Sequence, residues 1–280
     1  MAAASILDAL VIGAGPAGAA AAWSLARSGH RVRLVDRSRF PRNKTCGDAL
    51  IADSLSALDA MGLREAVARQ AIAAHELRIH APNGGAVSLA GRFLCLPRLQ
   101  LDALLVEAAR AAGAELASMT ATAPIEEDGR IAGATFASPD GAQTLRARVT
   151  LLATGANATV ANAFGVARSL KANAVAGRAY FRVPRELAAR HPHLSIVYTR
   201  GLCPGYGWIF PGPDDCYNVG VGFFSEGRRS TPSLHDLWRG FTAEFAPARE
   251  LVAHRQRWVS SGGRRCAPAF TMRCSDGPGC

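Results

Sequence analysis

Gly13-Ala14-Gly15-Pro16-Ala17-Gly18 is the stretch of sequence that decides the fold. It follows a short apolar run, Ile6 to Ile12, that is typical of a buried parallel strand. It opens an alanine-rich segment, Pro16 to Ser28, which predicts a helix ended by Gly29. A second β-branched strand, Arg31 to Val35, completes a βαβ unit. In such a unit the glycines permit a tight turn, close approach of a pyrophosphate to the helix N-terminus, and close packing of helix on strand.

An acidic residue stands where this unit needs one for a dinucleotide. Asp36 ends the second predicted strand, and a carboxylate there accepts hydrogen bonds from ribose hydroxyls. The same charge would repel a 2′-phosphate, which argues against NADP at this site. NAD and FAD share the glycine fingerprint, so these residues leave both open. Arg37 follows directly and is placed either to stack on an adenine or to remain a solvated arginine.

Two other stretches combine unusual residue types. The segment 39–48 reads Arg-Phe-Pro-Arg-Asn-Lys-Thr-Cys-Gly-Asp. Its cysteine, Cys46, has three cations close by in sequence, which favour a reactive thiolate, although an inert buried thiol is the alternative. The segment 204–211 reads Pro-Gly-Tyr-Gly-Trp-Ile-Phe-Pro and is followed by Gly-Val-Gly at 220–222. Its large flat side chains suit either an apolar ligand or the core of a strand.

Together these motifs resemble the geranylgeranyl reductase family of FAD-dependent oxidoreductases, over residues 6 to about 258. The resemblance implies the p-hydroxybenzoate hydroxylase-like fold, FAD as the cofactor, and reduction of C=C bonds in a prenyl chain. It also implies an isoprenoid or other apolar substrate and an external electron donor, NAD(P)H or ferredoxin. By matching position, Cys46 would lie beside the flavin and the aromatic segment would line the substrate cavity. The catalytic candidates are therefore Cys46, Tyr206 and Trp208.

The residues expected to bind the cofactor are spread over several segments of the chain. They are Gly13, Gly15, Pro16, Ala17, Gly18, Asp36, Arg37, Arg42, Gly47, Arg98 and Gly155. Arg98 begins an Arg-x-x-x-Asp segment on an amphipathic helix, and it resembles a cofactor contact of the family. Gly155 belongs to a segment, 151–156, that resembles the family's second Rossmann-strand motif, with Thr154 in place of its usual acid.

The predicted fold class is α/β: a Rossmann-type FAD-binding domain with an attached β-sheet substrate domain. The expected division into units is as follows: residues 1–75 and 98–165 form the FAD-binding domain, 76–97 and 166–258 the β-rich domain, and 259–280 an aperiodic tail without helix or strand. The family resembled here continues further, with a Gly-Asp-containing segment that closes over the flavin. That segment is missing from this sequence, so we expect a chain truncated at its C-terminus, with a tail typical of a changed reading frame.

Composition narrows the functions further. The net charge is +10, but the cations are almost all arginines spread along the chain, which argues against nucleic-acid binding. Weak attraction to lipid head groups, and so peripheral membrane contact, remains compatible with it. The seven cysteines show no metal-ligand spacing, and no metal is expected. The N-terminus lacks a charged region before its apolar run, so the expected location is the cytoplasm, with free thiols.

Three other interpretations compete with a prenyl reductase. A flavin monooxygenase or halogenase shares the predicted fold, although Tyr206 and Phe210 depart from the tryptophan-rich halogenase segment. An inactive truncated fragment is the second alternative, because the Gly-Asp segment is missing. A short-chain dehydrogenase is disfavoured, since neither lysine follows a tyrosine in the Tyr-x-x-x-Lys spacing that such enzymes need.

Overall fold

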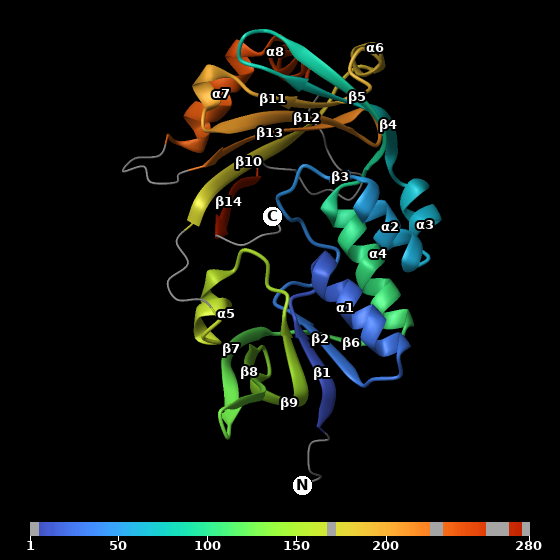
Figure 1. The fold of residues 1–280 in the computed structure, drawn as a ribbon, viewed down its shortest axis with the longest axis vertical. Helices are drawn as coiled ribbons and strands as arrows, with labels where there is room; N and C mark the ends of the chain where they lie inside the picture. The colour runs from blue at the N-terminus through green and yellow to red at the C-terminus, as the bar shows by residue number, and fades with distance from the viewer. Residues whose placement is uncertain (1–5, 167–171, 225–231, 256–268, 276–280) are drawn as a thin grey trace.

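The computed structural model describes residues 6–166, 172–224, 232–255 and 269–275, and it contains two sheets. In Figure 1 one sheet lies below the other, and a group of helices occupies the right-hand side between them. The lower sheet consists, in spatial order, of β6 (Glu115–Ser118), β2 (Val32–Asp36), β1 (Leu7–Ile12), β9 (Gly141–Leu152), β8 (Arg130–Ser138) and β7 (Thr120–Glu127).

The predicted βαβ unit forms the centre of the lower sheet. β1 pairs in parallel with β2 on one side and with β9 on the other, so the segment predicted to return to the first sheet does so. The strand interiors are buried because helices pack on one face: α1 (Pro16–Arg27) and α4 (Arg98–Ala111) share a core with β1 and β2. α5 (Ala158–Ala163) contributes Val160 to the core on the other face, around Phe136.

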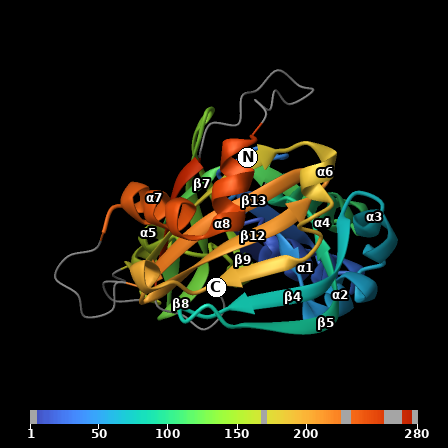
Figure 2. The ribbon, with the colours of Figure 1, turned by 90° about the horizontal axis from the view of Figure 1, so that it is seen from above.

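The upper sheet has eight strands and receives both of the stretches predicted to be β-rich. In spatial order they are β14 (Ala269–Ser275), β10 (Ala172–Arg182), β13 (Cys216–Phe224), β12 (Gly205–Gly212), β11 (Leu194–Val197), β4 (Ile72–His80), β5 (Ala86–Cys95) and β3 (Ala49–Leu50). All neighbours are antiparallel except β11 and β4. Figure 2 shows β13, β12, β11, β4 and β5 side by side as one twisted surface.

Among the described residues, helices cover the upper sheet on its outer side only. α7 (Leu234–Glu244) and α8 (Ala246–Ala253) lie above β12 and β13 in Figure 1, and α6 (Arg185–Ala188) lies beside them. Their apolar side chains share a core with the outward-facing residues of the sheet. The short helices α2 (Ala52–Ala60) and α3 (Arg64–Ala68) lie next to α4. The inner side of the sheet is thus left to face the dinucleotide-type unit.

One expectation about the tail was wrong. Within 259–280, where the sequence predicts neither helix nor strand, residues 269–275 form β14 and pair with β10. A strand at a sheet edge is held by backbone hydrogen bonds, so it needs no periodic side-chain pattern that sequence reading could detect. Residues 259–268 and 276–280 lie outside the described part of the chain.

The predicted domain boundaries and the division of the strands between the two sheets differ by a few residues. β4 begins at Ile72 rather than 76, and β3, from the predicted first domain, pairs with β5 in the upper sheet. The division into two domains stays a prediction. Among the described residues, no helix has both the length and the apolar character needed to cross a membrane.

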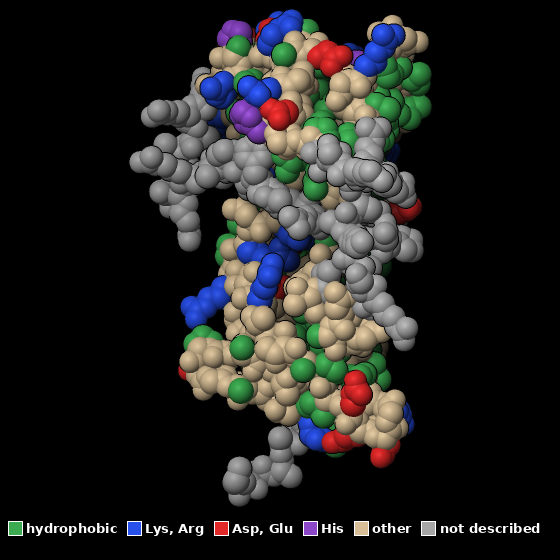
Figure 3. All heavy atoms as spheres, turned by 90° about the vertical axis from the view of Figure 1, so that its left-hand side faces the viewer, with side chains coloured by type: hydrophobic (Ala, Val, Ile, Leu, Met, Phe, Trp, Pro, Cys, Tyr) green, Lys and Arg blue, Asp and Glu red, His purple; other side chains and the backbone are tan. Residues whose placement is uncertain are grey.

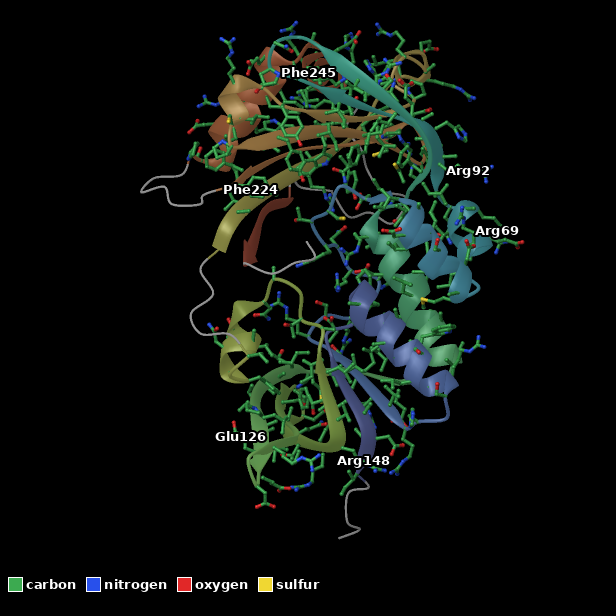
Figure 4. All side chains as sticks on the ribbon, viewed as in Figure 1. Arg69, Arg92, Glu126, Arg148, Phe224 and Phe245 are labelled. Carbon is green, nitrogen blue, oxygen red and sulfur yellow. The ribbon has the colours of Figure 1, made fainter. Side chains whose placement is uncertain are left out.

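The packing of α7 on the sheet generates a stability prediction. Phe241 is fully buried, and its ring lies against Gly207, where a Cβ would come within 2.5 Å of the ring. It also stacks on Phe245, labelled at the top of Figure 4, at a centroid distance of 5.9 Å. We expect Phe241→Ala to lower the free energy of unfolding by about 3–5 kcal/mol, measured by urea denaturation, because it removes a buried ring and leaves a cavity.

The matched control is Phe224→Ala. Phe224 is 46% exposed and lies at the left end of the upper sheet in Figure 4. If Phe224→Ala lowered the free energy of unfolding as much as Phe241→Ala does, the contact between α7 and β12 would not be a main source of stability in the core of the upper sheet.

Candidate dinucleotide site and the adjoining aromatic wall

The glycine fingerprint forms a turn in which strand, helix and return strand touch without intervening side chains. A Cβ on Gly13, whose φ is +104°, would lie 2.3 Å from the carbonyl oxygen of Ala153, just beyond β9. A Cβ on Gly18 would lie 1.7 Å from the carbonyl oxygen of Gly13. Gly15 occupies the N-cap of α1 and provides no capping side chain. The first-turn N–H groups of α1 therefore remain directed at this end of the helix, where an anion binds most favourably.

Asp36 lies against this turn, as the sequence predicts for a ribose-binding acid. One carboxylate oxygen accepts the N–H of Ala14 at 2.8 Å, and the other accepts the N–H of Ser38 at 2.8 Å. These bonds fix the carboxylate at the end of β2, beside the fingerprint. Arg37 is exposed. Gly155 lies in the loop after β9 and has a φ of +58°.

Two arginines face the same turn. The nearest heavy atoms to the position of a Gly15 Cβ are Nη2 of Arg42, at 3.7 Å, and Nη2 of Arg98, at 3.8 Å. Both guanidinium groups are held by Asp102, whose side chain is fully buried on α4. Arg98 binds it through two hydrogen bonds of 2.5 and 2.8 Å, and Arg42 Nη1 lies 3.0 Å from Asp102 Oδ2.

This charge arrangement fits a dinucleotide pyrophosphate. Two fixed cations and a helix N-terminus face a space that glycine leaves open, and Asp102, the acid between the two cations, is already paired with them. In the space-filling view of Figure 3, Lys and Arg side chains gather at the waist between the upper and lower parts of the molecule. The residues present can therefore hold the phosphates of FAD.

The segment 39–48 runs from this site to the upper sheet. Cys46 is partly buried, and its side chain lies near enough to that of Arg98 for the two to interact electrostatically. The backbone of the segment is fastened from above, because Arg178 Nη2 donates to the carbonyl of Lys44 at 3.1 Å and Asn218 Nδ2 donates to the carbonyl of Cys46 at 2.7 Å. We call residues 44–48 the connecting loop, since it contacts both the arginine pair and the sheet.

The aromatic segment of β12 lies directly over the connecting loop. A Cβ on Gly47 would come within 2.8 Å of the Phe210 ring and 3.7 Å of Trp208 Nε1. The indole of Trp208 lies flat on Gly220 of β13, where a Cβ would be 2.1 Å from the ring. The Gly-x-Gly segment at 220–222 thus makes room for Trp208. Tyr206 continues the row, with its ring 6.1 Å from that of Trp208. We call Tyr206, Trp208 and Phe210 the aromatic wall.

The aromatic wall continues as an apolar surface across the sheet. Strand register places Val87 beside Ile79, Ile79 beside Ile196, and Ile196 beside Trp208, so all four side chains are on the inner face. Exposure rises along this row: Trp208 is 5% exposed and Val87 is 60% exposed. This row of the inner face is therefore apolar from the connecting loop to β5.

Sequence reading missed the polar residues that lie beneath the wall: Asp48, Arg178, Tyr180 and Asn218. Asp48 was visible only as part of the Cys-Gly-Asp motif. It is buried, and its φ of +70° is rare for a residue with a side chain. Burial raises the pKa of the Asp48 carboxyl, against donors on Tyr180 and Asn218 that lower it. Asn218 carried a usable signal, because it is a polar residue at an inward-facing position of an apolar strand.

Asp102 generates a prediction about the arginine pair. We expect Asp102→Asn to lower the free energy of unfolding by about 3 kcal/mol or more in urea titrations, because two partly buried cations lose their shared anion. Flavin affinity should fall with it, since the guanidinium groups lose their fixed direction. Glu107→Gln is the control on the same helix: its exposed pair with Arg110 is worth about 0–1 kcal/mol. Equal effects of the two substitutions would rule out a special role for Asp102.

Comparison with known proteins identifies relatives over most of the chain. The menaquinone reductase of Mycolicibacterium smegmatis is 32% identical over 239 residues, which cover 79% of this chain and 56% of that protein. The digeranylgeranylglycerophospholipid reductase 1 of Methanopyrus kandleri is 28% identical over 263 residues, 91% of this chain and 67% of that protein. The chain thus spans between about half and two thirds of the length of these relatives.

Solved structures share the fold. A geranylgeranyl bacteriochlorophyll reductase-like protein from Thermoplasma acidophilum superposes with a TM-score of 0.76 at 22% identity, over 89% of this chain and 66% of that one. The flavin-dependent brominase Bmp2 superposes with a TM-score of 0.77 at 20% identity, over 91% and 66%. The family model for the FAD binding domain matches residues 7–196. With its fingerprint turn, arginine pair and sheet order, the chain belongs to the FAD-binding domain family, and its cofactor is FAD.

Proposed function

We propose that this chain takes part in reducing C=C bonds of a prenyl, geranylgeranyl-type chain, with FAD as the redox cofactor. The observation that carries the proposal is the contact between the aromatic wall and the connecting loop: Phe210 and Trp208 lie on Gly47, and the neighbouring Cys46 interacts with Arg98 of the arginine pair. An apolar surface thus begins at the place where the dinucleotide site ends. The names of the relatives, reductases of menaquinone and of digeranylgeranyl lipids, support a substrate of this class.

Each group of residues has a proposed task. The turn residues 13–18, with Arg42 and Arg98, bind the FAD pyrophosphate, while Asp36 binds the ribose and Arg37 flanks the adenine. The remaining FAD-binding candidates, Gly47 and Gly155, lie in the loops that border this turn. FAD bound at these residues in its reduced state would supply the hydride equivalent for reduction of a C=C bond, and a proton would complete the addition at the other carbon.

The aromatic wall and the apolar face orient the substrate and exclude water from it. Cys46, Tyr206 and Trp208 are proposed to contact the reacting region. The proposal includes an external electron donor, NAD(P)H or ferredoxin, and a cytoplasmic location. A lipid-like substrate and the net charge of +10 also favour contact with an anionic membrane surface.

The test of the proposal is direct. The purified chain is loaded with FAD, reduced anaerobically with dithionite, and incubated with geranylgeranyl diphosphate. Mass spectrometry should show products that have gained one H₂ for each double bond reduced. A flavin-loaded protein that leaves every prenyl substrate unchanged would contradict the proposal, and a product formed only with oxygen would favour a monooxygenase or halogenase instead.

The apolar row predicts a dependence on chain length. Three strand spacings, roughly 14 Å in total, separate Trp208 on β12 from Val87 on β5, so only a long prenyl chain reaches the outer strand. We expect Val87→Asp to weaken binding of geranylgeraniol about tenfold, because a charge replaces a side chain whose burial is worth about 1.5–3 kcal/mol. Binding of the shorter geraniol should be unchanged within about twofold, as measured by calorimetry on the FAD-loaded protein.

Ala86→Asp is the matched control. Ala86 neighbours Val87 on β5 and pairs with His80, and because side chains alternate along a strand it belongs to the outer face. It should affect neither ligand. Equal weakening of both ligands by Val87→Asp would show that the outer strand does not contact the end of the chain.

A further inference from the structure

Asn218 is the point at which the aromatic wall and the connecting loop meet. It is 3% exposed, and both ends of its amide are used. Oδ1 accepts the indole N–H of Trp208 at 2.9 Å. Nδ2 donates to the carbonyl of Cys46 at 2.7 Å and to Asp48 Oδ2 at 2.7 Å. One side chain thus contacts the aromatic wall and two residues of the connecting loop, one of which is the buried acid Asp48.

Asp48 extends this contact to the helix that bears Arg98. Its Oδ1 accepts the backbone N–H of Arg98 at 3.3 Å, while its Oδ2 accepts the hydroxyl of Tyr180 in addition to Asn218. The backbone carbonyl of Asp48 accepts the N–H of Leu96 at 3.0 Å. The carboxylate therefore receives donors from the upper sheet and from the start of α4 at once. Replacing Asn218 by an apolar residue would take a hydrogen-bond partner from the indole N–H of Trp208 and from the carbonyl of Cys46, which is costly for buried polar groups.

Water can reach the far side of this cluster. Asp48, Tyr180 and Asn218 line a pocket with a volume of about 50 Å³, which is room for a few water molecules. The ionisable groups around Asn218 are Asp48 and Cys46 on the loop and Arg178 and Tyr180 on β10, and the pocket adds the thiols of Cys95 and Cys216.

A space-filling role would not need this chemistry. An apolar residue of similar volume would fill the position of Asn218 without the cost of burying an amide. The amide instead orients two neighbours that share no other bond in the described residues: the indole of Trp208 and the carbonyl of Cys46. We propose that Asn218 is a positioning residue that fixes the spacing and orientation of the aromatic wall relative to the connecting loop. For its effect on prenyl reduction, this inference rests on the proposed function.

Two substitutions separate orientation from packing. Asn218→Leu keeps the volume and removes every hydrogen bond. Asn218→Asp keeps the acceptor for Trp208 but brings a second carboxylate against Asp48, so the loop loses its donor at mildly alkaline pH. On acidification two such carboxylates take up a shared proton, and the new O–H restores a donor. Asn162→Asp, on the exposed side of α5, controls for the added charge.

The first readout is the alkylation rate of Cys46 in the FAD-free protein, followed by peptide mass spectrometry. We expect Asn218→Leu to raise it about tenfold at every pH, relative to the original protein at the same pH. Asn218→Asp should raise it at mildly alkaline pH and return it toward the original rate in mild acid. Cys95, which is 1% exposed, should stay protected throughout. Alkylation of Cys95 together with Cys46 in Asn218→Leu would indicate that this variant unfolds. The positioning role would then be judged from Asn218→Asp alone, by comparing its Cys46 alkylation rate at mildly alkaline pH with its rate in mild acid.

The second readout is the fluorescence of Trp208, isolated by subtracting the emission of the matching Trp208→Phe protein. We expect the Trp208 emission to change at every pH in Asn218→Leu. In Asn218→Asp it should change at mildly alkaline pH and return toward the original emission in mild acid. In the FAD-loaded protein, kcat for geranylgeranyl diphosphate should fall about tenfold or more in Asn218→Leu, because misplacement of reacting groups by about 1 Å can cost a hundredfold in rate. KM and flavin content should change by less than about twofold, since the wall and the arginine pair remain present.

The outcomes distinguish the two proposals. Identical, pH-independent behaviour of Asn218→Leu and Asn218→Asp, or unchanged Cys46 and Trp208 signals in both, would overturn the positioning role. The expected signals in a protein that reduces no prenyl substrate would overturn the proposed function and leave the positioning role in place.

Discussion

The paired carboxylate of Asp102 is the interaction on which the dinucleotide site depends. It is fully buried on α4, yet it holds two guanidinium groups that come from different parts of the chain, Arg98 from its own helix and Arg42 from the segment after β2. Without it, two cations at the turn would repel each other and take up separate directions. With it, they form a rigid positive surface opposite the N-terminus of α1. Cys46 interacts with Arg98, and this interaction joins the connecting loop to the positive surface.

The two faces of the upper sheet differ chemically, and the inner one holds the connecting loop against the arginine pair. Its outer face is covered by α7 and α8 and has an ordinary apolar core. Its inner face combines an apolar row with a small polar cluster. In this cluster Arg178 and Asn218 donate hydrogen bonds to backbone carbonyls of the connecting loop. The loop is therefore held from below by the arginine pair and from above by the sheet. Burial raises the pKa of Cys95 to about 12, so this neighbour of Asp48 stays a neutral thiol.

Sequence reasoning succeeded where the determinants are close together along the chain. The strand, glycine turn and helix at residues 6–28 follow from local spacing, and the structure places Asp36 against that turn. The packing of Trp208 on Gly220 was harder to foresee, because the motif shows that both residue types are present but not that one lies on the other.

Contacts between residues far apart in the chain could not be predicted from the sequence. The bond between Asn218 and Asp48 joins residues 170 positions apart, and only the folded sheet register brings them together. The strand at 269–275 escaped prediction for a different reason, since its partner β10 supplies the order that its own sequence lacks.

The turn of the hairpin between β4 and β5 determines which side chains of β5 lie on the inner face. Its turn is set by Gly84, with a φ of +86°, and by two backbone bonds, from Ala81 N to the Gly85 carbonyl and from Gly84 N to the Ala81 carbonyl. That turn fixes His80 opposite Ala86 and so decides which β5 side chains point inward. A single inserted residue would shift the register and exchange the two faces of the strand. The length of a solvent-exposed turn therefore decides which β5 side chains the inner face presents to a ligand, without any substitution in the strand itself.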